Sequence, residues 1–290
     1  MSLLASDRQR ATLIQKAERL LELHHAAKLL VLPNIWDPLG ARLLESMGFP
    51  AVATASAAVA FSKGYDDGEK IRLDVLLDVI QQIAVSVSVP LTADVEGGYA
   101  DKPDAVAENI RRVLEAGAVG INLEDSHTED GTLRSIEEQY ARIQAVRKMA
   151  VQEGVPLVIN ARTDVFLSES GDPPKVRFAE TLSRSRAFLD AGADCIYPIG
   201  LGDLEMLEVL RGELRAPINV YAAASAPGMR ELEQAGISRL SLGPGLIRAS
   251  LDRMREVARA LQAYESYDSF TQDVMTSGEI REIVTKGNMP

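Results

Sequence analysis

The sequence contains one cysteine, Cys195, among 290 residues, and it has no long uninterrupted apolar run. A lone cysteine cannot form an intramolecular disulfide, which excludes the small disulfide-stabilised domains of secreted proteins. A membrane-spanning helix needs about 20 predominantly apolar residues in succession, and no segment reaches that length. Charges at Asp7 and Arg8 interrupt the N-terminal segment too early for a signal peptide. We therefore expect a cytoplasmic protein with no membrane partner.

Positive charge is scarce as well. The chain carries 31 lysine and arginine residues against 42 aspartate and glutamate residues, which gives a net charge of -11. Such a protein repels the phosphates of nucleic acids, so we expect no nucleic-acid partner. Hydrophobic residues make up 46% of the sequence, which is enough for one large core. We expect a single domain over residues 1–290.

A repeated boundary organises the chain. Four helical patterns end on a glycine that precedes a short apolar run, as in a left-handed helix cap: Gly48, Gly117, Gly192 and Gly236. Three other apolar runs begin at a proline, which is tolerated at the first residue of a strand: Pro90, Pro156 and Pro217. Together with a first run, these boundaries predict eight strands, near residues 28–33, 50–55, 90–95, 118–124, 156–161, 194–199, 217–222 and 238–242.

Helical patterns of period 3.6 lie between these strands, for example from Ile71 to Val87. Eight strand and helix units in succession predict an α/β fold, the (β/α)8 TIM barrel. The alternative is an open doubly wound sheet, which usually carries a glycine-rich turn after its first strand. Here the first strand is followed by Pro33-Asn34-Ile35-Trp36, so we favour the barrel.

The barrel leaves two segments outside it. Residues 1–27 are expected to form an extra N-terminal helix across the bottom of the barrel, and residues 28–265 the barrel itself. Residues 266–290 form a C-terminal extension that is too apolar for a disordered tail. This extension packs either on its own barrel or against another subunit.

Two strands deliver acids at their C-terminal ends. Asp94 and Glu96 follow the run Leu91-Thr92-Ala93, and strand alternation would point both side chains to one face. Glu124 follows the next apolar run. Carboxylates gathered in a cleft repel one another unless a cation joins them, and Mg²⁺ prefers oxygen ligands while it keeps several waters. These acids could also be ordinary surface residues at the strand ends, but we favour a metal site. The expected ion is Mg²⁺, with Mn²⁺ as an alternative.

The strand ends of a (β/α)8 barrel converge on one mouth, so other residues there are substrate-binding candidates. Trp36 follows the first strand, Ser56 follows the second, and Asn160 and Arg162 follow the fifth. Arg162 could bind an anionic substrate, and it could equally pair with Asp164 or Glu124. The small residues after Ser56 would let backbone N–H groups approach a carboxylate, although close packing would also explain them.

Other reactive residue types are less informative. His127 lies just after Glu124, but a lone histidine in a loop is usually solvated, so its role as a proton donor is the minority interpretation. Cys195 sits within an apolar strand and is expected to be a buried hydrophobe. No lysine occupies an inward strand position near the mouth, which disfavours a Schiff-base aldolase.

Several segments together resemble the isocitrate lyase and phosphoenolpyruvate mutase superfamily. They are Asn34-Ile35-Trp36-Asp37, Ala53-Thr54-Ala55-Ser56, Thr92-Ala93-Asp94-Val95-Glu96-Gly97-Gly98-Tyr99, 116–125 and Asn160-Ala161-Arg162-Thr163-Asp164. The resemblance implies a barrel whose eighth helix is swapped with a neighbouring subunit, a homotetramer, and Mg²⁺-dependent chemistry through an enolate of pyruvate. It covers nearly the whole barrel.

The resemblance also implies roles by motif position. Ser56, Ala57 and Ala58 would bind the carboxylate of the substrate, and Asp67 would be the acid of a mobile loop after the second strand. Asp94 would be the principal metal ligand, Glu96 and Glu124 would hold metal-bound waters, and Arg162 would contact the substrate.

The chain departs from the lyases of this superfamily in its loops. It has residues 126–135 where those lyases carry a Lys-Cys-Gly-His catalytic loop, and Ile199 where they place a glutamate. The resemblance therefore implies a short-loop branch, and we expect a Mg²⁺-dependent C–C lyase of a small 2-oxo or 2-hydroxy (di)carboxylate, acting by decarboxylation or by hydrolytic or retro-aldol-type cleavage. The alternatives are phosphonomutase chemistry at a C–P bond and a non-catalytic protein that binds metal and carboxylate.

Overall fold

The computed structural model describes residues 7–168 and 171–286. Its strands are β1 (Leu30–Leu32), β2 (Asn34–Ile35), β3 (Val52–Thr54), β4 (Leu91–Asp94), β5 (Gly120–Glu124), β6 (Val158–Thr163), β7 (Cys195–Pro198), β8 (Asn219–Tyr221) and β9 (Arg239–Ser241). All strand pairs are parallel, in a six-stranded sheet of order β2-β3-β4-β5-β6-β7 and a three-stranded sheet of order β1-β9-β8. A parallel bridge between Ile196 and Ile218 joins β7 to β8, so the two sheets close into a barrel.

Each of the eight predicted strand regions contains a strand, and a ninth strand, β2, follows directly after the first region. Pro33 separates β1 from β2, and the two strands pair with different neighbours, β1 with β9 and β2 with β3. Proline has no N–H to continue a ladder, while its carbonyl still accepts a hydrogen bond from Ala53 N at 3.1 Å. Asn34 then ties the two sheets together, because its Nδ2 donates to Thr54 O at 2.7 Å and its Oδ1 accepts from Leu242 N at 2.8 Å.

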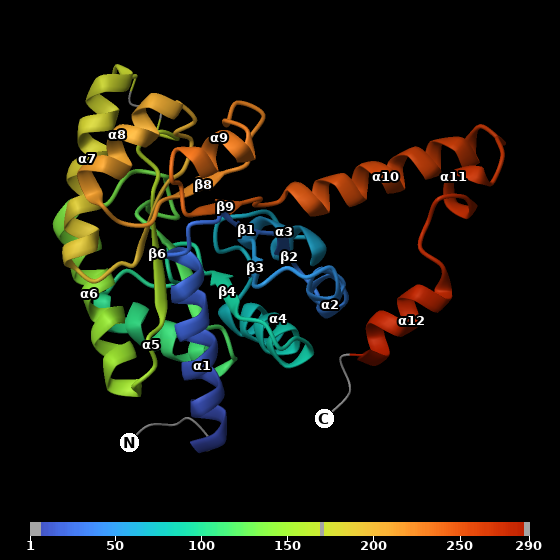
Figure 1. Cartoon of the computed structure of the whole chain (residues 1–290), viewed down its shortest axis with the longest axis horizontal. Coiled ribbons are helices and arrows are strands. Elements are labelled where there is room, and N and C mark those ends of the chain that lie inside the picture. Colours follow the sequence, from blue (N-terminus) through green and yellow to red (C-terminus); the bar gives the residue numbers. More distant parts are fainter. Residues whose placement is uncertain (1–6, 169–170, 287–290) are drawn as a thin grey trace.

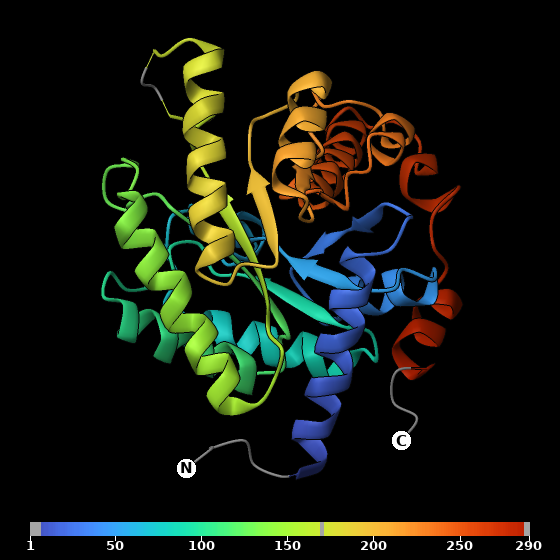
Figure 2. The same ribbon diagram turned by 60° about the vertical axis from the view of Figure 1, so that its left-hand side comes forward.

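Helices cover the outside of the barrel (Figures 1 and 2). They are α1 (Asp7–His24), α2 (Pro38–Ser46), α3 (Ser56–Ser62), α4 (Leu73–Ser86), α5 (Pro103–Glu115), α6 (Ile136–Glu153), α7 (Pro174–Asp190), α8 (Leu204–Leu214), α9 (Met229–Gln234), α10 (Gly245–Gln262), α11 (Asp268–Thr271) and α12 (Ser277–Lys286). One of the predicted glycine caps is Gly117, which ends α5 shortly before β5. Its φ is 107°, a backbone angle that favours glycine. A Cβ there would lie 2.6 Å from the Cβ of Ala84, so no other residue fits. None of the described helices is long and apolar enough to cross a membrane.

Helix α1 lies against the N-terminal ends of the strands, as expected for the extra N-terminal helix. Gly120, the first residue of β5, makes room for it, since a Cβ at this position would lie 2.7 Å from Leu20 Cδ2. His24, at the end of α1, is fully buried, and this burial lowers its pKa to about 3. The bottom of the barrel is therefore covered, and the opposite end carries the cavity described below.

Helix α10 departs from the barrel. It extends away from the strands (Figure 1), and Ile247, in its first turn, is its buried residue. Leu251 is 50% exposed, Met254 66% and Leu261 45%. After α11, the chain returns, and α12 packs against α2, where Arg42 Nη1 donates to the carbonyl of Val284. Of the two placements left open for the C-terminal extension, the structure thus shows α12 on its own barrel; residues 1–6 and 287–290 lie outside the described part.

Candidate active site

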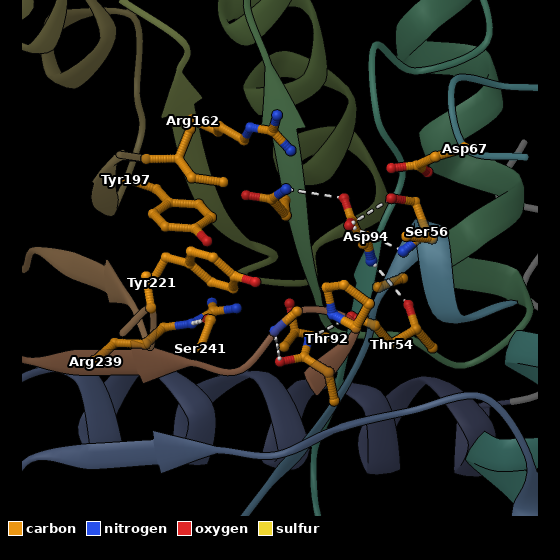
Figure 3. Close-up of a pocket in the computed structure, with 18 of the residues that line it drawn as sticks. Thr54, Ser56, Asp67, Thr92, Asp94, Arg162, Tyr197, Tyr221, Arg239 and Ser241 are labelled. Atoms are coloured by element: carbon orange, nitrogen blue, oxygen red, sulfur yellow. Dashed lines mark hydrogen bonds between the residues drawn. The ribbon is translucent and has the colours of Figure 1, made fainter. Parts of the chain in front are cut away.

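A cavity of about 360 Å³ opens at the C-terminal ends of the strands (Figure 3). Every strand from β2 to β9 contributes to its wall, through Asn34, Thr54, Asp94, Asn122, Arg162, Tyr197, Tyr221, Arg239 and Ser241. Ser56 and Ala57 from α3 and Asp67 from the loop after α3 complete one side. The wall is unusually polar for a barrel interior, which is normally filled by branched apolar side chains.

Asp94, the last residue of β4, is held firmly in this wall. Its Oδ2 accepts hydrogen bonds from Ser56 N at 3.0 Å and Ser56 Oγ at 2.9 Å. Its Oδ1 accepts from Asn122 Nδ2 at 2.8 Å, and Asn122 Oδ1 in turn accepts from Asn160 Nδ2 at 2.9 Å (Figure 3). Glu96 N donates to the same Oδ1 at 3.4 Å, so the carboxylate is fixed by four donors, and Asn160 acts behind Asn122 instead of lining the cavity.

Glu96 lies beside the cavity without lining it, and its direction is set differently from the one predicted. The strand ends at Asp94, and Glu96 has a left-handed φ of 50°, so strand alternation does not set its direction. Its Oε2 accepts from Glu69 N at 2.7 Å, and the side chain is buried. Burial, together with the charges of Asp67 and Asp94, raises the pKa of Glu96 to about 8.

Asp67 lines the mouth of the cavity, close enough to Asp94 for the two negative charges to repel each other. Although the residue is exposed, desolvation of its carboxyl and the charge of Asp94 raise its pKa, while a hydrogen bond with Ser56 acts in the opposite direction. Asp67, Asp94 and Glu96 therefore carry an excess of negative charge that a bound cation would relieve.

Arg162 lies between two acids. Its Nη1 is 2.7 Å from Glu124 Oε2, and its Nε is 2.6 Å from Asp164 Oδ1. Desolvation disfavours the charge of Arg162, but these two carboxylates hold its pKa above its usual value. Both sequence interpretations of this residue therefore have support, because Arg162 is ion-paired and also lines the cavity.

The donor set fits a hard divalent cation such as Mg²⁺. Within residues 7–168 and 171–286, no three His, Cys, Asp or Glu side chains converge closely enough to hold an ion by themselves. Asp94 could bind the ion directly, with Glu96 and Glu124 acting through water, and this is how Mg²⁺ usually binds in proteins. The raised pKa values of Asp67 and Glu96 are the observation that favours a cation here.

A pH experiment tests this electrostatic argument. Because Glu96 holds its proton more tightly in the folded protein, metal-free stability should fall as the pH rises from about 6 to 8; Asp125, with a pKa of about 6, contributes in the same direction only in the lower part of this window. Mg²⁺ should therefore raise the thermal midpoint more at pH 8 than at pH 6, as measured by differential scanning fluorimetry. The variant Glu96→Gln should show a smaller pH dependence. A Mg²⁺ shift that is the same at both pH values would contradict the argument.

Several predicted residues do not line the cavity: Trp36, Ala58, Glu96, Glu124, His127 and Asn160. Trp36 and Ala58 pack with Ala55 and Ile247 in a small apolar cluster behind the wall. His127 lies in a turn, where its backbone N–H donates to Thr132 O at 2.8 Å. Its side chain is near the carboxylates of Asp101, Asp130 and Glu138. The structure gives no support to His127 as a proton donor.

Sequence reasoning missed Arg239. This residue was overlooked because it opens β9, at the end of the strand away from the mouth, although its long side chain lines the cavity. The available signal was an arginine two positions before Ser241 in an otherwise apolar strand, since alternate residues share a face. Cys195 is fully buried, and burial raises its pKa to about 12, which agrees with its interpretation as a hydrophobe.

Comparisons with known proteins agree with this architecture. The sequence model of the phosphoenolpyruvate phosphomutase family matches residues 20–262. The uncharacterised protein Rv1998c of Mycobacterium tuberculosis is 30% identical over 83% of this chain and 87% of its own length. A 2-methylisocitrate lyase of Halalkalibacterium halodurans is 23% identical over 93% and 89%, and oxaloacetate decarboxylase 2 of Pseudomonas fluorescens is 25% identical over 77% and 78%.

A solved structure is similar along most of the chain. It is a protein of Burkholderia cenocepacia described as a candidate phosphonomutase, 36% identical, with a TM-score of 0.81 over 84% of this chain and 99% of that one. The sequence and the structure thus lead to the same group of proteins.

Proposed function

Because the chain belongs to the isocitrate lyase and phosphoenolpyruvate mutase superfamily, we propose that it is a Mg²⁺-dependent C–C lyase of small 2-oxo or 2-hydroxy dicarboxylates. The observation that carries the proposal is Asp94, fixed by Ser56 and Asn122 in a cavity at the strand ends. That cavity, of about 360 Å³, is at the small end of the range for ligand pockets, which suits a short acid. Among the relatives, those named 2-methylisocitrate lyase and oxaloacetate decarboxylase support C–C lyase chemistry.

Different groups around Asp94 would bind the metal, the substrate carboxylate and the developing negative charge. When bound, Mg²⁺ would act as a Lewis acid beside the oxygen on which enolate charge develops. Ala57 lines the cavity and lies in the first turn of α3, where backbone N–H groups have no acceptor within the helix, so its N–H can bind a substrate carboxylate, whereas Ala58 packs behind the wall. The guanidinium of Arg162 lies on the other side of the cavity, and its fixed charge favours a developing anion there.

Tyr197 is suited to donate a hydrogen bond. It lines the cavity, and its burial raises its pKa far above the usual value, so the hydroxyl keeps its proton. An anionic oxygen at this place can accept from it. The proton that converts an enolate into pyruvate would come from water, because Cys195, the chain's single cysteine, is buried in β7 and cannot act as a loop acid.

Phosphonomutase chemistry remains the second candidate. It is favoured by the family model, which is that of the phosphoenolpyruvate phosphomutases, and by the similar structure from Burkholderia cenocepacia. The same metal and the same carboxylate site would serve it, since both reactions pass through an enolpyruvate-like species. The two differ in the bond that breaks.

A substrate panel tests the proposal. We expect pyruvate or CO₂ release from oxaloacetate or from a substituted malate, with loss of turnover after chelation by EDTA and recovery with Mg²⁺ or Mn²⁺. Phosphorus NMR with 3-phosphonopyruvate would detect the second candidate. Turnover that survives complete removal of divalent ions would contradict metal dependence, and tight binding of oxalate without any turnover would favour a non-catalytic binder.

We also propose a homotetramer in which α10 is swapped between neighbouring subunits. The support is the direction of α10, away from its own barrel, and its exposed apolar residues Leu251, Met254 and Leu261. Multi-angle light scattering should give four times the 31.4 kDa chain mass. Replacing Leu251 and Met254 by glutamate should lower that mass, whereas the same change at Val151, an exposed residue of α6, should not. A monomer at micromolar concentration would contradict the proposal.

A further inference from the structure

Arg239 carries a positive charge without a partner in the cavity. Its side chain is only 3% exposed, its Nε donates to Ser241 Oγ at 3.1 Å, and its Nη1 makes no hydrogen bond. Among the ion pairs of the described residues, none involves this guanidinium. Arginine cannot shed its proton in a protein, so the charge remains. A buried charge normally has a counterion, and here no residue within 7–168 and 171–286 supplies one in contact.

The contrast with Arg162 makes this informative. Both arginines line the same cavity, but Arg162 is already paired with Glu124 and Asp164. Its charge is balanced within the protein, whereas that of Arg239 is not. An anion that enters the cavity would therefore be stabilised more by the unpaired charge of Arg239 than by the paired charge of Arg162.

The surroundings of Arg239 supply donors for such an anion. Arg239 and Ser241 share the inward face of β9, and Leu240 between them packs outward in the apolar layer. In β8, Asn219 is the register partner of Arg239; it is fully buried, and neither Nδ2 nor Oδ1 has a hydrogen-bond partner. The Tyr221 side chain also lines this wall.

The two walls of the cavity thus differ in charge. Figure 3 shows Arg239, Ser241 and Tyr221 on one side, with Asp94, Ser56 and Asp67 across the cavity from them. The first wall offers hydrogen-bond donors and a free cation, and the second offers carboxylates for a metal. A ligand that satisfies both walls has one end suited to a metal and another end that is an anion.

We propose that Arg239 binds a second anionic group of the substrate, a carboxylate or a phosphonate, at the end remote from the metal. This inference rests on the proposed function, which places the first carboxylate and the reacting carbon near Ser56 and Asp94. It assigns the second acid group of that substrate to the wall formed by β8 and β9, opposite Asp94. Arg239 is then a specificity-determining residue.

Binding of three 2-hydroxy acids tests the inference. Lactate, malate and 3-phosphonolactate share the same acid end and differ at C3, which carries hydrogen, a carboxylate or a phosphonate. By calorimetry with Mg²⁺, the intact protein should bind one of the two dianions at least about 10-fold more tightly than lactate, since hydrogen bonds to charged groups contribute roughly that factor or more. The tighter of the two identifies the anionic group.

Three variants assign that preference to Arg239. Arg239→Met should remove the preference, roughly a 10- to 100-fold loss for the dianion, while the affinity for lactate stays the same. Arg239→Lys should restore part of it. Arg186→Met, which removes an exposed arginine of α7, should behave as the unmodified protein. Equal weakening of lactate and of both dianions by Arg239→Met would indicate a structural role and overturn the inference.

The outcome does not depend on the folding of Arg239→Met. If the unmodified protein binds lactate, malate and 3-phosphonolactate equally, the inference is wrong without any variant. If the protein turns over none of the substrate panel but shows an Arg239-dependent preference for a dianion, the proposed function fails and the anion subsite stands. If it turns over a panel member with no dependence on Arg239, the proposed function stands and the subsite fails.

Discussion

Replacement of Asp94 by asparagine is expected to reduce turnover on the order of 1000-fold, equivalent to about 4 kcal/mol of lost transition-state stabilisation. The substitution removes the negative charge that would hold the cation. It also replaces one acceptor oxygen by an NH₂ group, which would face the donors of Ser56 or Asn122. Steady-state kinetics on the substrate found by the panel would measure the loss.

The matched control for this variant is Asp104→Asn. Asp104 is an exposed aspartate in the first turn of α5 that does not line the cavity, so the same chemical change should leave turnover within about 2-fold. Circular dichroism would verify that both variants fold. A folded Asp94→Asn protein with more than a tenth of the original activity would refute the metal site.

Replacement of Arg162 by methionine should destabilise the protein by about 3 to 5 kcal/mol, because it leaves the carboxylates of Glu124 and Asp164 buried and unpaired. A loss of this size is a large part of the total stability of a typical protein, which is about 5–15 kcal/mol. The free energy of unfolding in urea, at fixed protein concentration, is the measurement. Activity should fall as well, because the same residue lines the cavity.

Arg186→Met is the matched control for this stability experiment. Arg186 pairs with Glu213 at the surface, with side chains 57% and 50% exposed, so losing that pair should cost at most about 1 kcal/mol. The double variant Arg162→Met with Glu124→Gln should recover part of the lost stability, because one of the two unpaired charges is gone. Equal destabilisation by Arg162→Met and Arg186→Met would show that the ion pairs of Arg162 with Glu124 and Asp164 do not stabilise the fold more than a surface pair does.

The barrel was predictable because its signals are local and repeated. Glycine caps such as Gly117, proline-led strands and helical periodicity recur along the chain, and each repeat supports the others. Asp94 was predictable for the same reason, since a strand end in a parallel barrel has a defined location. Its partners Ser56 and Asn122 belong to other elements, and only the closed barrel shows that they hold its carboxylate.

The rest of the site depends on features that a sequence pattern does not encode. The route of Glu96 is set by a left-handed backbone angle after the strand has ended, which no alternation rule anticipates. The sequence left open whether Arg162 forms an ion pair or faces the substrate site. In the structure it is paired with Glu124 and Asp164 and also lines the cavity. Arg239 was missed because the reach of a long side chain, and not the position of its Cα, brings it to the cavity.

The break at Pro33 has a consequence for how this site can change over time. The six-stranded sheet carries Asp94, Asn122 and Arg162, and the three-stranded sheet carries Arg239 and its neighbours. Under the proposed function, the residues for bond cleavage lie on one sheet of the barrel and the residues for substrate choice lie on the other. If that division holds, substitutions confined to β8 and β9 would change the acid that is bound and leave Asp94, Asn122 and Arg162 in place, so the boundary at Pro33 would let the two properties evolve separately.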